Sequence, residues 1–400
     1  MFGVGRIGTL GSPSSGGGLP WWLPLAGGVA PTYFADFRTE GSTGPRYWFN
    51  GLPYLSFSAW NTAVSATYAR AQAVNYTKSG LIVSANSGVA RFPTTAAGVP
   101  TGLRLTGAQT ELTLWNRDLT NAAWTATTAT VAKDQTGADG AATSASSILA
   151  TAGNATVLQA ITSGSAARTM GAWVKRLTGS GVINITQDNG GTWTPIVPTG
   201  SWAFYQLPTA TLANPTVGFQ IVTSGDAIAV DFVTERSAVF LADPIATTTV
   251  SVAQTADAYQ FPFAQTVFTA LVITQNQIAN TGSPRIIGLD SGGSDTPIFI
   301  NTSTKFSEFS NSVSLAGPVV GSNVTNLHKT AVSGSGAATR LTSDGLAAVT
   351  NANRITSATP TTFILGAAVA GGNPAYGDIA LLAIWNGVMG SVADLQRLTL

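Results

Sequence analysis

The 400-residue sequence contains no cysteine and a single histidine, His328. Without cysteine the chain can form neither disulfides nor thiolate metal sites. One histidine cannot supply a zinc site built on a histidine pair, and we do not expect it to belong to a Ser-His-Asp triad. These absences argue against the common metal sites and nucleophilic catalytic sites. His328 is interpreted as a polar strand residue.

Charged residues are also scarce, at 9% of the chain, with 19 Lys+Arg, 18 Asp+Glu and a net charge of +1. A typical soluble domain carries about 25%. Because 44% of the residues are hydrophobic, charge-driven disorder is excluded and sizeable cores are expected. The densest basic spot is Lys175-Arg176, which is too small to neutralise a phosphate backbone, so no nucleic-acid partner is expected.

Long hydrophobic runs are absent as well. No stretch reaches the roughly 18 apolar residues of a membrane-spanning helix, so we expect no membrane insertion. The apolar segment 19–31 is interrupted by three prolines, and only Arg6 precedes it as a basic residue. A secretory signal peptide is therefore not expected.

Short runs rich in β-branched and aromatic residues alternate with turn dipeptides such as Asn50-Gly51. In the run 226–235, Ile228, Val230 and Phe232 alternate onto one predicted strand face. No heptads or fixed-period repeats are present. The pattern predicts an all-β fold of tandem antiparallel β-sandwiches, or jelly rolls, after an extended N-terminal arm.

Residues 1–32 form the predicted arm, because Gly, Ser and Pro dominate them. Paired tryptophans are unusual in a flexible linker, so the arm is predicted to anchor on a partner or a neighbouring subunit. Folding back on its own chain is the open alternative. The predicted anchoring residues are the large apolar ones: Phe2, Ile7, Leu10, Trp21, Trp22 and Leu23.

The chain closes with a strand that is apolar on both faces, 377–386, followed by a short helical segment. A strand of this kind is predicted to be central in its sheet. Ser391 and Asp394 have capping-box spacing, and Val392, Leu395 and Leu398 recur on one helical face. Because the helix is too short to stand alone, we expect it to pack on the sandwich.

The last 135 or so residues resemble concanavalin A-like (laminin-G-like) jelly-roll domains. The resemblance rests on the order of QTVFTALVITQ, NLHKTAVSG, TRLTSDG, TTFILGA, YGDIALLAIWNGVMG and SVADLQRL. Calcium sites in that family use clustered aspartates, and here only Asp290 and Asp295, in a Gly/Ser loop, are candidates. A solvated turn is the favoured interpretation, so no metal or other cofactor is predicted.

Residues 55–262 resemble phage virion proteins that carry carbohydrate-binding-module-like jelly rolls. The matching segments are TYARAQAVNYTKSGLIVSANSGVARF, GLRLTGAQTELTLWNRDLTNAAWT, MGAWVKRL and ADPIATTTVSVAQTADAYQFP. The resemblance implies a head fibre, head spike or tail fibre on the surface of a phage particle. Its implied partners are capsid, portal or tail proteins, bound through the arm, and host surface glycans. Low charge and the apolar arm predict contacts between subunits, and therefore a homo-oligomer. Fibres of this kind are often trimers, but the sequence contains no stalk motif that supports a trimer.

The chain is thus divided into four predicted regions: the arm 1–32, an N-terminal β region 33–115, a carbohydrate-binding-module-like jelly roll 116–262 and a laminin-G-like jelly roll 263–400. A carbohydrate-binding adhesin outside any virion and a glycan depolymerase are the alternative functions. Host, glycan and location on a head or a tail stay open.

Sugar-binding β-sandwiches use exposed aromatic rings, because a ring face stacks on the C–H face of a sugar. The candidates are Trp173, Trp193, Trp202 and Tyr205. Met170, Ala172 and Val174 share one predicted strand face, which places Trp173 and Lys175 on the other. A tryptophan packed between the sheets is the favoured alternative for Trp173, because tryptophan is usually well buried.

Asp226, Asp231 and Glu235 are close in sequence and are the candidates for a carboxylate pair that hydrolyses glycosides. Asp231 and Glu235 are four residues apart, or about 13 Å along a strand. That separation exceeds the roughly 5–9.5 Å of glycosidase pairs. The sequence therefore predicts a non-enzymatic protein in which these carboxylates lie on a solvated edge.

Overall fold

The computed structural model describes residues 29–39, 45–95, 97–237, 241, 243–276, 283–290, 296–302, 304–310, 313–321, 323, 326–335, 337–352, 355–356, 358–367, 377–387 and 391–400. The chain forms two compact units, each built from separate stretches of sequence. Unit 1 takes its described residues from Met1–Thr67, Pro100–Leu105 and Ala258–Leu400. Unit 2 comprises Tyr68–Val99 and Thr106–Asp257. Strands dominate both units, as the sequence predicts for an all-β fold.

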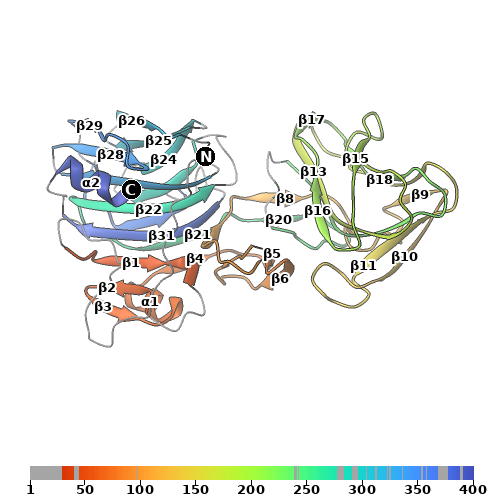
Figure 1. The fold of residues 1–400 in the computed structure, drawn as a ribbon, viewed down its shortest axis with the longest axis horizontal. Coiled ribbons are helices and arrows are strands. Elements are labelled where there is room, and N and C mark those ends of the chain that lie inside the picture. Colours follow the sequence, from red (N-terminus) through yellow and green to blue (C-terminus); the bar gives the residue numbers. More distant parts are fainter. Residues whose placement is uncertain are drawn as a thin grey trace. The chain divides into compact units, whose positions relative to one another are not determined.

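Unit 1 contains a large antiparallel sheet in which the C-terminal strand is central (Figure 1). Its order is β29 (Val349–Asn351), β28 (Thr339–Ser343), β27 (Leu327–Gly334), β22 (Phe268–Asn276), β31 (Gly377–Asn386), β1 (Tyr33–Asp36), β2 (Tyr47–Phe49) and β3 (Leu52–Tyr54). β7 (Leu103–Leu105) pairs with the first residues of β31. The predicted central position of β31 is confirmed, because β22 lies on one side of it and β1 on the other.

A second antiparallel sheet faces the first. Its order is β26 (Val313–Val319), β25 (Lys305–Ser310), β24 (Thr296–Thr302), β23 (Arg285–Asp290), β30 (Thr362–Leu365) and β21 (Ala258–Pro262). Aromatic rings pack across the interior, with Phe261 stacked 5.1 Å from Phe363 and 5.2 Å from Tyr33 of the first sheet. Unit 1 is therefore a β-sandwich. The 3-10 turn η1 (Phe37–Thr39) adds the buried Phe37 to its aromatic core, and helix α1 (Phe57–Ala63) adds the buried Trp60.

The C-terminal helix α2 (Val392–Thr399) covers the outer face of the first sheet. The predicted cap is confirmed, because the Ser391 hydroxyl accepts a hydrogen bond from the Asp394 backbone N–H at 3.2 Å. Leu395 is fully buried in a cluster with Leu381 and Trp385. The prediction for Val392 is wrong, since its side chain is 37% exposed. In this first turn of the helix the apolar stripe already turns towards solvent.

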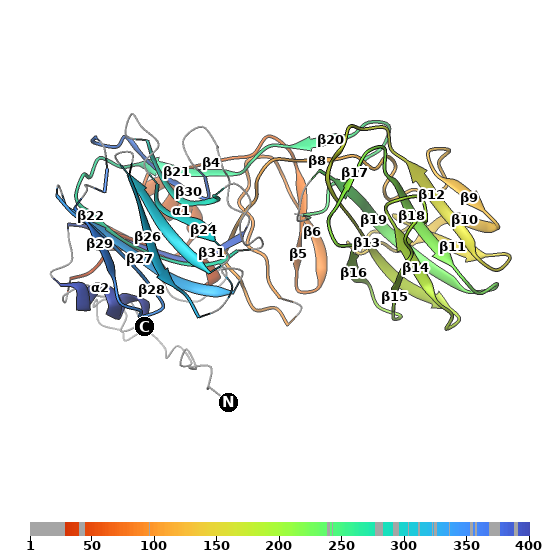
Figure 2. The ribbon, with the colours of Figure 1, turned by 90° about the horizontal axis from the view of Figure 1, so that it is seen from above.

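Unit 2 is a second two-layer sandwich, seen from above in Figure 2. The first layer, here the β13 sheet, has the order β10 (Ala129–Gln135), β11 (Ala145–Ala150), β19 (Ala227–Arg236), β13 (Ala166–Thr178) and β16 (Ala203–Gln206). β17 (Ala210–Leu212) extends the pairing of β13, while β8 (Gln109–Glu111) pairs with β19 and with β20 (Val252–Gln254). The opposing layer has the order β15 (Thr194–Ile196), β14 (Ile183–Thr186), β18 (Thr216–Ile221), β12 (Ala155–Ala160) and β9 (Thr125–Thr127).

Between these layers lies an apolar core that includes Met170, Ala172 and Val174, so the predicted inward face of β13 is confirmed. The hairpin of β5 (Val74–Lys78) and β6 (Leu81–Ala85) also belongs to unit 2. Its Ile82 packs on the outer face of the β13 sheet. β4 (Thr67–Ala69) is the strand at which the chain passes from unit 1 to unit 2.

A β-bulge in β19 overturns part of the predicted strand pattern. Ile228 and Val230 lie in the core as predicted, but Phe232 does not, and Val233 takes the next core position. Phe232 has a positive φ of 45°, and the pairing with β13 skips a residue at this point. An extra residue in one strand reverses the alternation beyond it. Phe232 is thereby turned to the outer face.

The predicted anchoring residues of the arm, from Phe2 to Leu23, lie outside the described residues. The last four residues of the predicted arm are held on unit 1. Trp385 donates its indole N–H to the Val29 carbonyl at 2.9 Å, and the Thr32 N–H bonds to Ile384 at 2.7 Å. Strands from the predicted region 33–115 belong to both units, while the four-part division itself stays a prediction.

Candidate functional site

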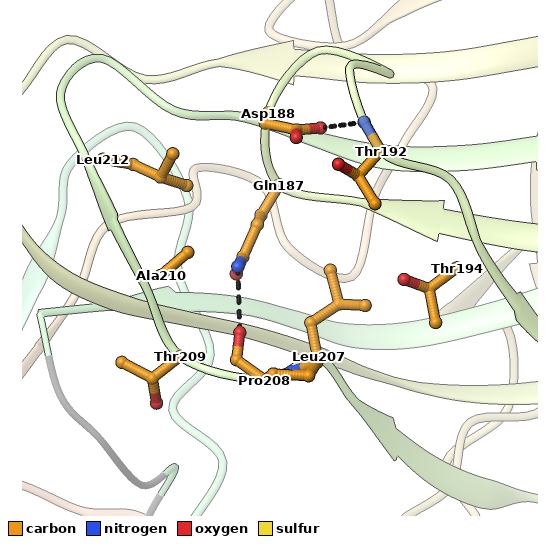
Figure 3. A pocket seen from close by; sticks show the side chains of 9 residues that line it. All are labelled: Gln187, Asp188, Thr192, Thr194, Leu207, Pro208, Thr209, Ala210 and Leu212. Carbon is orange, nitrogen blue, oxygen red and sulfur yellow. Dashed lines mark hydrogen bonds between the residues drawn. The ribbon is translucent and has the colours of Figure 1, made fainter.

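Unit 2 contains a pocket of about 220 Å³ at one edge of its sandwich (Figure 3). One wall comes from the connection between β14 and β15, and the other from the connection between β16 and β17 and from β17 itself. The residues that line it are Gln187, Asp188, Thr192, Thr194, Leu207, Pro208, Thr209, Ala210 and Leu212. Carboxylate, amide and hydroxyl groups thus share the pocket with aliphatic side chains. This mixture suits a small ligand that has both hydroxyl groups and C–H faces.

Asp188 is the charged group of the pocket, and its loop holds it in place. Its Oδ1 accepts hydrogen bonds from the Thr192 N–H at 2.9 Å and from the Thr186 hydroxyl at 2.8 Å. Partial burial opposes ionisation, but these hydrogen bonds outweigh it, so the pKa of Asp188 lies below its ordinary value. A carboxylate has about four acceptor positions, so Asp188 remains able to accept from hydroxyl groups of a ligand.

Gln187 joins the two walls from behind. Its amide nitrogen donates to the Pro208 carbonyl at 3.0 Å, and its Oε1 accepts the Met170 N–H at 3.1 Å. Figure 3 shows this side chain reaching to Pro208, with Leu212 and Ala210 on one side of it and Thr194 and Leu207 on the other. Because both ends of the amide are bonded to backbone, the pocket is formed without a ligand.

Trp193 lies in the same loop, half-buried and between two pocket-lining threonines. Its indole packs on Gly190, where an added Cβ would come within 2.8 Å of the ring. Gly190 also has a φ of +76°, a left-handed conformation that favours glycine. Trp193 therefore supports the shape of the loop, and the structure places it beside the pocket rather than among its lining residues.

The other three predicted aromatic residues separate onto two faces of the β13 sheet. Trp173 is 9% exposed and lies on the outer face, where Phe232, Ile82 and Trp202 surround it. It is therefore buried, but not between the two sheets. Tyr205 lies on the opposite, inner face, packs against the core and donates its hydroxyl to the Val197 carbonyl at 2.7 Å. The four candidates do not form one site.

Sequence reasoning missed the pocket and one exposed ring. Phe204 pairs with Trp173 across β13 and β16, and its side chain is 39% exposed. The alternation of Trp202, Phe204 and Gln206 with Tyr205 could have placed Phe204 beside Trp202. No comparable sequence pattern indicates the pocket, because its walls come from connections that lie together only in the folded sandwich.

The carboxylates considered for hydrolysis are buried, so the prediction of a solvated edge is wrong. Asp231 is paired with Arg117, with 2.7 Å between Oδ1 and Nε. Glu235 is fully buried, and burial foremost, with the neighbouring Glu111 carboxylate, raises its pKa to about 8. The bulge at Phe232 also turns the two side chains to opposite faces. They cannot act together on a sugar.

The metal candidates remain a prediction without a test. Asp290 ends β23, and Asp295 lies outside the described residues. Within the described part of the chain, no group of three or more His, Asp or Glu side chains could hold a metal ion. His328, interpreted from sequence as a polar strand residue, lies on β27 and contacts Asp344 at 2.6 Å. In the same described part, no helix is long and apolar enough to cross a membrane.

No protein-family model matches the sequence, and no curated protein matches it. Among solved structures, the chain is similar to the carbohydrate-binding module CBM40 of the Ruminococcus gnavus IT-sialidase, bound to α2,3-sialyllactose. The TM-score is 0.29 and the identity 13%, over 34% of this chain and 84% of that one. Domain 4 of AbnA, a GH43 extracellular arabinanase from Geobacillus stearothermophilus in complex with arabinotriose, gives 0.28 and 14%, over 36% and 73%. Domains LG4-5 of the mouse laminin α1 chain give 0.23 and 9%, over 72% and 89%.

Proposed function

We propose that this chain is a structural component of a phage or phage-like particle and that it attaches to host surface glycans through the pocket of unit 2. The pocket carries the glycan part of the proposal. It combines the ionised Asp188, the amide of Gln187 and three threonine hydroxyls with apolar walls from Leu207 and Leu212. Sugar hydroxyls need several acceptors and donors at short range, and sugar C–H groups need apolar contact.

The size of the pocket limits what it binds. Pockets for drug-sized ligands measure about 300–1,000 Å³, so a pocket of about 220 Å³ suits one sugar ring of a longer chain. One such contact is weak by itself. Several copies of the protein on one particle would raise the overall avidity by roughly 10²–10⁴. Weak single sites and multivalent display agree with a fibre or spike protein.

The particle part of the proposal is supported by the sequence resemblance and by the composition. The surface of a β-rich chain with 9% charged residues must consist largely of small polar residues, which is common in virion fibres. The same pocket would serve an adhesin outside any virion. Incorporation into a particle distinguishes the two.

The pocket predicts a pair of variants with opposite outcomes. Ala210→Leu places a larger side chain on the pocket wall, whereas Thr211→Leu adds similar bulk to the exposed face of the same strand. On a glycan array, the full-length chain should bind a set of glycans. The affinity for them should fall at least about tenfold, or about 1.4 kcal/mol, in Ala210→Leu and stay unchanged in Thr211→Leu.

Two outcomes would contradict the pocket as the glycan site: no glycan bound by the wild type, or equal binding by both variants. Asp188→Asn is a milder second variant, because the amide keeps one acceptor oxygen and loses the charge. It should weaken binding without closing the pocket. Release of reducing ends from a bound glycan would favour the depolymerase instead.

A further inference from the structure

The outer face of the β13 sheet presents an aromatic surface formed by Trp173, Trp202 and Phe204, with Lys175 at its margin. Register places these residues together. Trp173 pairs with Phe204, with 5.8 Å between the ring centroids, and Lys175 lies two residues beyond Trp173 on the same strand face. Its ammonium lies 4.9 Å from the centroid of the Trp202 ring. This surface contains none of the pocket-lining residues.

Exposure increases stepwise across the aromatic surface. Phe232, beneath it, is 1% exposed, Trp173 is 9% exposed and Phe204 is 39% exposed. Trp202 is half-buried. The buried rings fix the position of the exposed ones, because the β6 hairpin and the loop at Ala138 pack around them. An aromatic platform held in this way loses little conformational entropy when a ligand stacks on it.

The cations on this face differ in their partners. Arg117, over the Phe232 ring, is paired with two carboxylates, Asp231 and Asp139, with contacts of 2.7 and 2.8 Å. Lys175 forms no salt bridge with any described residue; its described contact is the Trp202 ring. A cation–π contact at an exposed site is weak, so the ammonium stays available to an anion. The surface therefore offers one ammonium group, without a carboxylate partner among the described residues, beside flat rings.

The indole N–H of Trp173 lies beneath this surface. Trp173 Nε1 is buried and, in the described part of the structure, has no hydrogen-bond partner. Because this nitrogen is buried, a ligand on the surface does not reach it, and its N–H signal reports on the rings packed around it.

We propose that the aromatic surface is a second carbohydrate site, selective for sugar chains that carry carboxylates. The C–H faces of the sugars would stack on Phe204 and Trp202, and a sugar carboxylate would pair with Lys175. Uronic acids and other acidic sugars supply this combination of apolar faces and negative charge. The proposal extends the proposed glycan role to a surface that functions without the pocket.

The test uses hexagalacturonate and its methyl ester, which differ in charge and share the same sugar chain. With the full-length protein labelled with ¹⁵N, the acid should shift the indole N–H signals of Trp173 and Trp202, assigned through single Trp→Phe variants. Trp202→Ala should weaken binding of the acid at least about tenfold. Lys175→Gln should bind acid and ester equally, whereas the wild type prefers the acid. Lys133→Gln, which replaces an exposed lysine at the far edge of the same sheet, is the matched control.

The proposal is overturned if the acid shifts neither indole signal up to millimolar concentration, or if the wild type binds acid and ester alike. It is also overturned if Ala210→Leu abolishes the binding, since the acid would then occupy the pocket. The two proposals can fail separately. If the protein binds the acid but no glycan in the pocket, the pocket proposal fails and this one stands. If it binds glycans in the pocket but not the acid, only this proposal fails. Lys175→Gln keeps the test valid if Trp202→Ala does not fold.

Discussion

At the scale of single residues, most of the buried charged side chains in the described part of the chain lie in unit 2. Arg91 is fully buried and contacts the carboxylates of Asp243 and Asp257. Arg236 is likewise buried and bonds to Glu111 at 3.0 Å. Both of these arginines have an opposite charge, which offsets their loss of hydration. Removing one partner would leave an uncompensated charge and cost about 3–5 kcal/mol.

Glu235 is the exception, because its two carboxyl oxygens have no hydrogen-bond partner in the described structure. Its pKa is about 8 in the folded protein, whereas the ordinary value is 4.5. Below about pH 4.5 both states carry the proton. As the pH rises towards 8, the unfolded chain loses that proton and the folded chain retains it, so folding is progressively disfavoured. Each unit of pKa difference corresponds to about 1.4 kcal/mol.

We therefore expect Glu235→Gln to remove this pH dependence. The free energy of unfolding of the variant should equal that of the wild type near pH 4. It should exceed the wild-type value by a few kcal/mol above pH 8, because glutamine is neutral at both pH values. Urea unfolding at several pH values measures the difference, with the exposed Asp134→Asn as control. Parallel curves for wild type and Glu235→Gln would show that Glu235 is ionised in the folded state.

At the scale of elements, two short irregularities decide which side chains meet. The bulge in β19 places Phe232 under Trp173, and so builds the base of the aromatic surface. A second bulge, between the pairs Ile273–Leu381 and Thr274–Ile379, brings Ala380 into the same cluster as Leu381. The sequence places these two residues on opposite faces, and the inserted residue is the reason for the difference.

The C-terminal helix gives a matched pair of predictions at this scale. Leu395→Ala should lower the free energy of unfolding of unit 1 by about 2–5 kcal/mol, because it leaves a cavity under the helix. Val392→Ala should cost less than about 0.5 kcal/mol, since Val392 is 37% exposed. Chemical denaturation monitored by tryptophan fluorescence measures both. Similar costs for the two variants would contradict the observed packing of the helix.

At the scale of the whole molecule, each unit is assembled from distant parts of the chain. β1 pairs with β31, more than 340 residues away, and β7 pairs with the same strand. Unit 2 likewise joins β8 to β19 and β20. The chain therefore cannot be cut at a single point into two independent folds. A deletion that leaves the fold intact must therefore retain both strands of each long-range pair.

The predicted anchoring role of the N-terminal segment can be tested by a deletion that keeps the strand pairs of unit 1. Deletion of residues 1–28 keeps the hydrogen bonds of Val29 and Thr32 to unit 1 and should leave the melting temperature and glycan binding unchanged. It should abolish incorporation into particles, if the segment anchors the protein. Deletion of residues 1–32 should lower the melting temperature as well. Normal incorporation of the 1–28 deletion, scored by particle purification and immunoblotting, would contradict the anchoring proposal.

The sequence by itself determined the local properties of this protein. The all-β class, the capped terminal helix and the doubly buried β31 follow from residue spacing, because alternation and capping act over a few neighbours. Only the tertiary structure decided the pairing of β1 with β31, the pocket and the aromatic surface. Each of these needs chain segments or strand registers that are brought together by core packing. Local spacing placed Trp173 opposite the core face, but the bulge and the β6 hairpin decided what covers it.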